Sequence, residues 1–181
     1  MPSSLTRRRF LGLAAAASGG LAVGCRRPDH PPPRDFGPAG KSLSGEELAL
    51  CAAACERVLP KDEEPGAKEL GVVDFIDRRL ARPGKRAARS AARLRRGLHA
   101  LSDWAWKRHG RHFVDLKPGD QDVAMASFAA EGGDKAYATV RQLVLLTLEG
   151  AFADPVYGGN RDRAGWKLVG FDAPCPNPRC E

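Results

Sequence analysis

The feature that most constrains the fold is a long run of apolar residues at helical spacing in the middle of the chain. Between residues 87 and 105 these residues recur every three or four positions without a break until Gly110, namely Ala87, Ala91, Leu94, Leu98, Leu101 and Ala105. Such a run is typical of a long amphipathic helix with one buried face. No segment of useful length alternates apolar and polar residues, as a half-buried strand would. The spacing therefore predicts an all-α fold.

Four further helices are expected around this one. The first carries a capping box, because Ser44 precedes Glu47 by three residues, and it stops at Pro60. The others are expected over 71–82, 118–131 and 134–152, the last with Asp134 as its cap. The 134–152 segment has almost no polar face in its middle, so we place it at the centre. The prediction is an irregular bundle of about five helices followed by a loop-rich C-terminal segment.

The amino terminus has the organisation of a twin-arginine export signal. Thr6 is followed by three arginines, an aromatic residue and an apolar residue, and the signal residues are Arg7, Arg8, Phe10 and Leu11. The apolar stretch 11–23 is rich in Ala and Gly and is shorter than the roughly 20 residues that a membrane-spanning helix needs. We therefore expect residues 1–24 to be a removable leader and the chain to be exported in folded form.

The residues around Cys25 indicate a lipid anchor. Leu21-Ala22-Val23-Gly24-Cys25 resembles a lipobox, in which the thiol of the cysteine receives a diacylglycerol. The alternative is cleavage by the general signal peptidase, which would leave Cys25 as a plain thiol. Residues 25–42 are rich in proline, which favours extended backbone and suits a tether. The expected organisation is a leader, a tether over 25–42 and a helical domain over 43–181, held in the periplasm as a membrane-attached lipoprotein.

The charge of the chain is positive and unevenly distributed. Removing residues 1–24 takes away three arginines and no acid, which lowers the net charge from +7 to +4. Acidic residues gather between Glu46 and Asp77, whereas arginine and lysine gather between Arg78 and Arg96. A basic patch of this kind binds nucleic acid, anionic lipid or an acidic protein face. Export makes nucleic acid the least suitable partner of the three.

Four cysteines besides Cys25 are candidates for disulfides in an oxidising compartment, Cys51, Cys55, Cys175 and Cys180. The first two are four residues apart on one helix, where Cβ atoms lie about 5–6 Å apart, beyond disulfide geometry. We therefore favour cross-links from the first helix to the C-terminal tail. A bridge between the two tail cysteines and free buried thiols are the alternatives.

No catalytic or metal-binding constellation is evident. His109 and His112, with Asp115 beyond them, are too loosely spaced around Gly110 for a metal site and are expected to face solvent. The chain has neither a nucleophile elbow nor a Gly-rich dinucleotide loop, and no motif for covalent haem. We expect no metal, no cofactor bound by this chain and no enzymatic activity of its own.

The most particular segment lies near the carboxyl terminus. Paired glycines there permit positive φ, and aromatic residues provide large contact surfaces. The candidate partner-interface residues are Tyr157, Gly158, Gly159, Asn160, Trp166 and Phe171. Such a segment either docks against a partner or wraps the helices of its own chain, and the residues alone leave both open.

Taken in order, these motifs resemble the gluconate 2-dehydrogenase subunit 3 family. The resemblance covers residues 43–174 and rests on the leader and on three ordered groups of residues: Leu43-Ser44-Gly45-Glu46-Glu47 with Val58-Leu59-Pro60, Gly66-Ala67 with Gly71-Val72-Val73-Asp74-Phe75-Ile76-Asp77, and Tyr157-Gly158-Gly159-Asn160 with Gly165-Trp166. It implies a small subunit of a complex whose large subunit binds FAD and oxidises a sugar or polyol, often beside a cytochrome c subunit. Catalysis and FAD would belong to the large subunit, and the small subunit would supply its export signal, maturation and stability.

A second hypothesis belongs to a different class. The chain would then be a stand-alone envelope lipoprotein whose arginine-rich central helix lies against anionic lipid or an acidic envelope protein. Two features depart from the family pattern and keep this hypothesis open. They are the lipobox with its proline-rich tether and the four cysteines of the mature domain.

Overall fold

The computed structural model describes residues 30–171. The predicted signal residues Arg7, Arg8, Phe10 and Leu11, the lipidation candidate Cys25, and the tail cysteines Cys175 and Cys180 lie outside this range. The predictions of export, lipid attachment and cross-linking to the tail therefore remain predictions.

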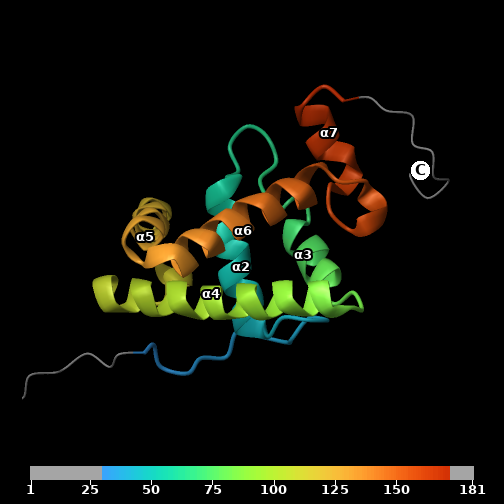
Figure 1. Cartoon of the computed structure of the whole chain (residues 1–181). Helices are drawn as coiled ribbons and strands as arrows, with labels where there is room; N and C mark the ends of the chain where they lie inside the picture. Colours follow the sequence, from blue (N-terminus) through green and yellow to red (C-terminus); the bar gives the residue numbers. More distant parts are fainter. Residues whose placement is uncertain (1–29, 172–181) are drawn as a thin grey trace, which may run out of the picture.

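The described chain is an irregular bundle of α-helices with short 3-10 turns between them (Figure 1). The helices are α2 (Gly45–Val58), α3 (Val72–Leu80), α4 (Lys85–His109), α5 (Pro118–Glu131), α6 (Gly133–Phe152) and α7 (Ala164–Leu168). The 3-10 turns are η1 (Phe113–Asp115), η2 (Pro155–Tyr157) and η3 (Arg161–Arg163). No strand occurs in residues 30–171, and none of the helices found there is both long enough and apolar enough to cross a bilayer.

The predicted fold class is confirmed, with two differences in detail. The five expected helices are present, and the C-terminal segment adds the short helix α7, which the sequence pattern did not predict. The capping box is confirmed, because Ser44 Oγ accepts from the backbone N–H of Glu47 while the Glu47 carboxylate accepts from that of Ser44. Asp134 is not the cap of α6: the helix begins one residue earlier, and its N-cap position is Gly132.

Helix α6 holds the bundle together. It lies across α2 and beside α4 and packs against α2, α3, α4, α5 and α7 (Figure 1). Its contact with α4 is close at Gly97, where an added Cβ would come within 2.3 Å of the Thr139 side chain. Farther along, the Gln142 amide donates to the Ser90 carbonyl at 3.1 Å. The core beneath is mainly aliphatic, with Leu50, Leu98, Leu101 and Leu143 among its fully buried side chains.

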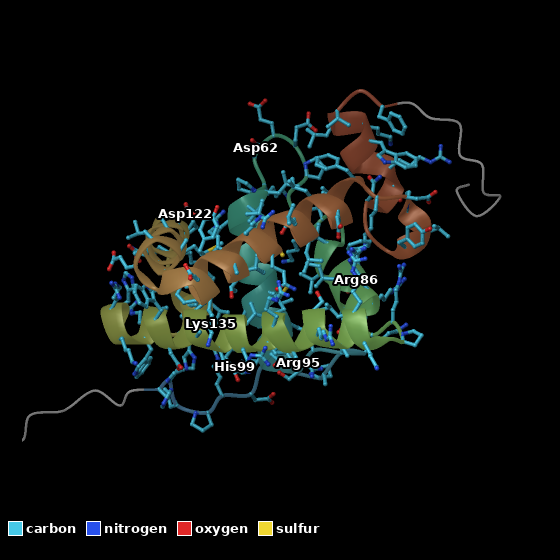
Figure 2. All side chains as sticks on the ribbon, in the orientation of Figure 1. Asp62, Arg86, Arg95, His99, Asp122 and Lys135 are labelled. Atoms are coloured by element: carbon cyan, nitrogen blue, oxygen red, sulfur yellow. The ribbon has the colours of Figure 1, made fainter. Side chains whose placement is uncertain are left out.

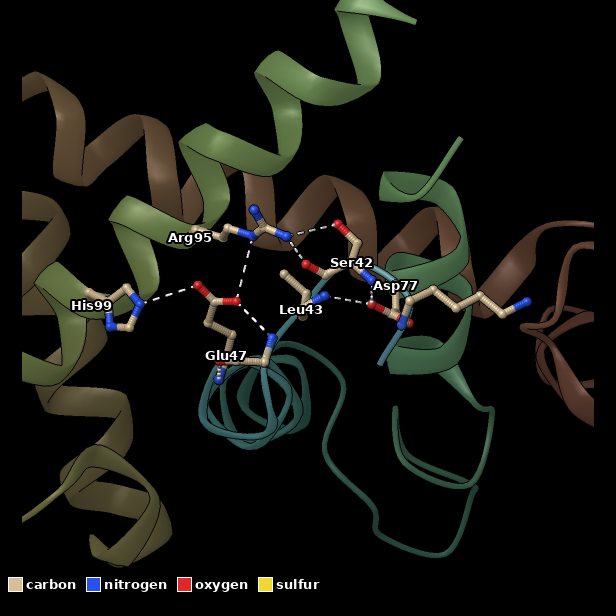
Figure 3. Close-up of polar contacts among 8 residues, drawn as sticks. Ser42, Leu43, Glu47, Asp77, Arg95 and His99 are labelled. Carbon is tan, nitrogen blue, oxygen red and sulfur yellow. Dashed lines mark hydrogen bonds and ion pairs between the residues drawn. The ribbon is translucent and has the colours of Figure 1, made fainter. Parts of the chain in front are cut away.

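Two buried carboxylates fasten the residues before α2 to the bundle (Figure 3). The Asp77 side chain of α3 accepts from three consecutive backbone N–H groups, those of Lys41, Ser42 and Leu43, at 2.6–2.9 Å. The Glu47 carboxylate lies 3.2 Å from His99 Nε2 and 3.6 Å from Arg95 Nε, both on α4. Buried carboxylates are tolerated when they are satisfied in this way. These two acids therefore have a structural role.

The described part of the proline-rich stretch lies along α4 and η1. His30 contacts Asp103 of α4 at 3.0 Å, and Arg34 forms an ion pair with Asp115 at 2.6 Å. Phe36 packs edge-on against the ring of His112. From residue 30 onward, therefore, the chain rests against the helical body. The first described residue is located beside the C-terminal third of α4.

Candidate partner-binding surfaces

One side of α6 presents large apolar side chains to solvent. Tyr137, Leu145 and Leu148 are 61%, 51% and 42% exposed. Their spacing of eight and three residues places them on one side of the helix, and we call them the α6 apolar face. On the opposite side Leu143 is fully buried in the core. Leu145 and Leu148 are neighbours on this side, and the exposed Arg141 lies between them and Tyr137. Exposed apolar residues of this size commonly mark an interaction site.

This face corrects part of the sequence-based picture of α6. The helix is central, as predicted, because most other elements pack against it. It is not enclosed, however, because those elements cover only one side, and Leu145 and Leu148 extend outward. The sequence did contain a signal, since apolar residues occupy more of the circumference than one buried face requires. That excess did not show which residues would be left exposed.

The C-terminal segment, residues 153–171, is clamped to the end of α6 by one asparagine. Asn160 is fully buried, and its backbone is left-handed, with φ 49°. Its Nδ2 donates to the Ala153 carbonyl at 2.9 Å, and its Oδ1 accepts from the Gly165 N–H at 2.8 Å. The side chain thus joins the two ends of the loop, a role for which a buried amide with both partners is well suited. Asn160 positions the segment and is not available to touch a partner.

Two glycines let this segment lie against the backbone of α6. A Cβ on Gly159 would lie 2.1 Å from the Gly150 carbonyl oxygen, and one on Gly165 would lie 1.9 Å from the Ala151 carbonyl oxygen. Both contacts are with backbone atoms, which cannot move aside as a flexible side chain can. Gly158 adopts φ 98°, a left-handed conformation that favours glycine. The glycines of the motif are therefore explained by packing within the chain.

The aromatic residues of the segment divide between the core and the surface. Trp166 is nearly buried, and its indole N–H donates to the Phe152 carbonyl at 2.8 Å. Phe171 packs edge-on against it with ring centroids 5.3 Å apart, yet remains 53% exposed. Tyr157 is 50% exposed, with the Arg82 guanidinium 5.2 Å from its ring centroid. Of the six residues singled out from the sequence, Tyr157 and Phe171 are the two that reach solvent extensively.

A shallow groove connects the C-terminal segment to α6. It has a volume of about 500 Å³, and Phe75, Phe152 and Tyr157 contribute its aromatic lining. Arg79 and Glu149, which form an ion pair at 3.1 Å, also line it. Arg82 is a third charged residue of the lining. The groove thus combines aromatic walls with an ion pair and a further arginine, and aromatic residues and arginine are both enriched at protein interfaces.

A second surface, on α4, has the opposite character. Arg86, Arg89, Arg93 and Arg96 are all exposed, and their three- and four-residue spacing places them on one side of the helix; we call them the α4 arginine face. None of the four forms an ion pair within residues 30–171. Arg95 and Arg108, on the same helix, do find partners, in Glu47 and Glu131. Figure 2 shows Arg95 and His99 on the side of α4 that lies next to the N-terminal segment.

The two described cysteines form a close pair inside the core. Cys51 and Cys55 are fully buried free thiols, and their sulfur atoms lie 3.9 Å apart, far beyond the roughly 2 Å of a disulfide. The hydrogen bond with Cys55 and then burial raise the pKa of Cys51 well above its usual value, so this group stays a neutral thiol. A cross-link to the tail would need one of these enclosed sulfur atoms to become accessible. The predicted cross-link remains untested.

The surroundings of His112 differ from those that were predicted. The expectation that His109 and His112 face solvent is wrong for His112, which is buried with its ring against Phe36 and Trp106. It was mispredicted because the packing of residues 30–36 over η1 cannot be foreseen from local spacing. Within residues 30–171 no group of three or more His, Cys, Asp or Glu side chains is arranged to hold a metal ion.

The fold and these surfaces define an all-helical protein whose distinctive features are exposed faces and a tightly clamped loop. Residues 45–173, well over half of the chain, match the family model described as gluconate 2-dehydrogenase subunit 3. The chain therefore belongs to the gluconate 2-dehydrogenase subunit 3 family. By its name, this family is a subunit of a dehydrogenase complex. No curated protein and no solved structure matches the chain.

Proposed function

We propose that this chain is the non-catalytic small subunit of a periplasmic FAD-dependent dehydrogenase that oxidises gluconate, a related sugar or a polyol. It supports the twin-arginine export, maturation and stability of the large flavoprotein subunit. FAD is bound by that large subunit, and a cytochrome c subunit is a further expected partner. Family membership over residues 45–173 and the twin-arginine pattern at Arg7 and Arg8 support this proposal.

The single observation that carries the proposal is the α6 apolar face with the clamped C-terminal segment beside it. Tyr137, Leu145 and Tyr157 each leave half or more of their surface in water. Burying apolar surface contributes about 25 cal/mol per Å², and aromatic anchors commonly dominate protein interfaces. Because the segment is held by Asn160 and by backbone contacts, little ordering is needed when a partner docks. These features suit a stable complex with a large protein.

The division of labour follows from what each chain would supply. The twin-arginine route carries folded proteins, so a leaderless flavoprotein that has already taken up FAD would cross the membrane with a partner that has the leader. The small subunit would need a surface that binds the folded large subunit before export. The α6 apolar face meets that requirement, and it does not depend on any cofactor in this chain.

The proposal is tested by affinity capture of the tagged full chain from detergent-solubilised membranes, followed by an absorption spectrum and mass spectrometry. The expected result is a large oxidoreductase chain in the eluate together with a flavin spectrum. Recovery of the chain alone and colourless, from cells that also express an FAD-dependent dehydrogenase large subunit, would overturn the proposal.

Surface variants identify the docking face in the same assay. The double variant Leu145→Asp, Leu148→Asp places two charges on the α6 apolar face and is expected to abolish flavoprotein capture. Val123→Asp is the matched control, because Val123 is an apolar residue of α5 that is 61% exposed and lies outside both surfaces. Loss of capture in both variants would point to general damage, and full capture in both would exclude this face.

A further inference from the structure

We propose that the α4 arginine face binds an anionic lipid surface and orients the protein on the membrane. Arg86, Arg89, Arg93 and Arg96 are exposed, share one side of the helix and have no ion-pair partner within residues 30–171. Several arginines on one side of a helix can contact the phosphate headgroups of an anionic lipid surface at the same time. This inference is separate from the docking of the flavoprotein on α6.

The position of these arginines opposes the stability of the helix that carries them. The first turn of α4 has no acidic residue, and residues 85–96 contain six cations and no acid. Cations near a helix N-terminus oppose the macrodipole, and like charges at i and i+4, such as Arg89 and Arg93, repel each other. Local rules are broken in this way chiefly where function requires it. An external anionic surface would relieve both effects.

A groove beside the α4 arginine face could bind a lipid headgroup. It has a volume of about 680 Å³ and lies between α4 and the start of α6. Arg93, Arg96 and Lys135 supply positive charge at this groove, which also includes one acid, Asp134. Phe128 and small residues such as Ala100 and Ala136 provide apolar lining. Cationic and apolar groups lining one groove fit a phosphate group joined to a lipid glycerol and acyl chain better than they fit a fully hydrated ion.

The exit point of the N-terminal chain favours lipid over an acidic protein as the occupant. His30 contacts Asp103, which lies seven residues, or two turns, after Arg96 on nearly the same side of α4. Cys25 precedes His30 by five residues, which span at most roughly 17 Å. A lipid attached at Cys25 would therefore hold the bilayer within reach of the α4 arginine face. The binding itself does not require that attachment.

The test is co-sedimentation of the full chain with lipid vesicles, using Cys25→Ser so that no lipid is attached. Vesicles of equal parts phosphatidylglycerol and phosphatidylcholine are compared with vesicles of phosphatidylcholine alone. The variant Arg86→Gln, Arg89→Gln, Arg93→Gln, Arg96→Gln is expected to bind the anionic vesicles at least about tenfold more weakly. The binding of the parent chain should also fall as salt is raised. Every chain in the vesicle assay also carries Arg7→Gln, Arg8→Gln and Arg9→Gln, so that a basic leader does not bind the anionic vesicles in place of the α4 arginine face.

The matched control removes the same charge elsewhere, through Lys61→Gln, Lys68→Gln, Lys117→Gln and Lys167→Gln, all of which lie outside α4. It should bind anionic vesicles as the parent chain does, and circular dichroism should show both variants folded. Equal binding by the arginine variant and the control would overturn the proposal. So would loss of flavoprotein capture by the arginine variant with vesicle binding intact, because the face would then belong to a protein interface. Vesicle binding lost with flavoprotein capture retained supports the proposal, whatever partner α6 binds.

Discussion

Helices α4 and α6 pack against each other, yet their outward faces are opposite in character. Both bury leucines on their inner sides, Leu98 in one helix and Leu143 in the other. Outward, α4 presents four arginines that form no ion pair within the described part of the chain, whereas α6 presents Tyr137 and two leucines. The inner faces explain the fold, because they account for the shared core. The outer faces contribute little to the fold, so their contrasting chemistry points to two kinds of partner.

The two surfaces also differ in how rigidly their exposed side chains are held before a partner binds. The C-terminal segment beside α6 is fixed by a buried asparagine and by glycines packed on backbone, so its exposed aromatic residues keep one arrangement. The α4 arginines are long and flexible, and the rigid element is the helix beneath them. Apolar docking benefits from a fixed shape, while attraction to a charged surface tolerates mobile side chains.

The largest expected effect is on the free energy of unfolding, and it tests the distinction between the inner and outer faces of α6. Leu143→Ala should lower the free energy of unfolding by about 2–5 kcal/mol, because it leaves a cavity in the core. Leu145→Ala, two residues away and half exposed, should change it by less than about 0.5 kcal/mol. Urea denaturation followed by circular dichroism measures both. Similar losses for the two variants would mean that the α6 apolar face is part of the core.

The next effect concerns the clamp of the C-terminal segment. Asn160→Ala should cost about 2–3 kcal/mol, because the Gly165 N–H and the Ala153 carbonyl lose their partner in a buried site. It should also reduce flavoprotein capture by loosening the loop. Tyr157→Ala serves as the comparison, since its ring is half exposed and its loss should reduce capture while stability hardly changes. An unchanged melting temperature for Asn160→Ala would show that the clamp is not structural.

Substitutions on the outer face of α4 are expected to raise stability slightly. The double variant Arg86→Gln, Arg89→Gln should raise stability by a few tenths of a kcal/mol, because two cations are removed from the positive end of the helix dipole. The gain should shrink in high salt, which screens exposed charges. Thermal melts at low and high ionic strength measure it. A loss of stability would mean that these arginines make intramolecular contacts and are not held free for a partner.

The smallest expected effect is the reaction of the native protein with an alkylating reagent at the two thiols in the core beneath α6. Both thiols are enclosed in the core, and the hydrogen bond with Cys55 and then burial raise the pKa of Cys51, so alkylation in the native state near neutral pH should be very slow. In denaturant without reductant, mass spectrometry should show both Cys51 and Cys55 alkylated. Protection that persists until a reductant is added would instead show a disulfide, as the cross-link to the tail favoured by the cysteine spacing requires.

Much of the architecture could be predicted because it depends on local patterns. The stepping of apolar residues from 87 to 105 predicts α4, and the Ser44–Glu47 capping box marks the start of α2. The same ordered motifs pointed to the family that the match over residues 45–173 confirms. By contrast, the short helix α7 and the burial of His112 were not predicted, because both depend on contacts between segments far apart in the chain.

The C-terminal motif shows the same limit within a single loop. Its residues could be recognised in the sequence. Their spacing did not show which side chains hold the loop in place and which ones face outward. The structure assigns Gly159, Asn160 and Trp166 to internal packing and leaves Tyr157 and Phe171 largely exposed. The difference depends on the backbone of α6, against which the loop packs.

By itself, the sequence determined that this protein is helical, approximately where its main helices begin and end, and to which family it belongs. These properties follow from capping, periodicity and ordered motifs, which act over one or two turns of chain. Only the tertiary structure decided that α6 leaves Leu145 and Leu148 in water and that four arginines of α4 form no ion pair with any residue of 30–171. The physical reason is that exposure and ion pairing depend on which elements pack alongside a residue, and residues distant in the sequence supply those elements.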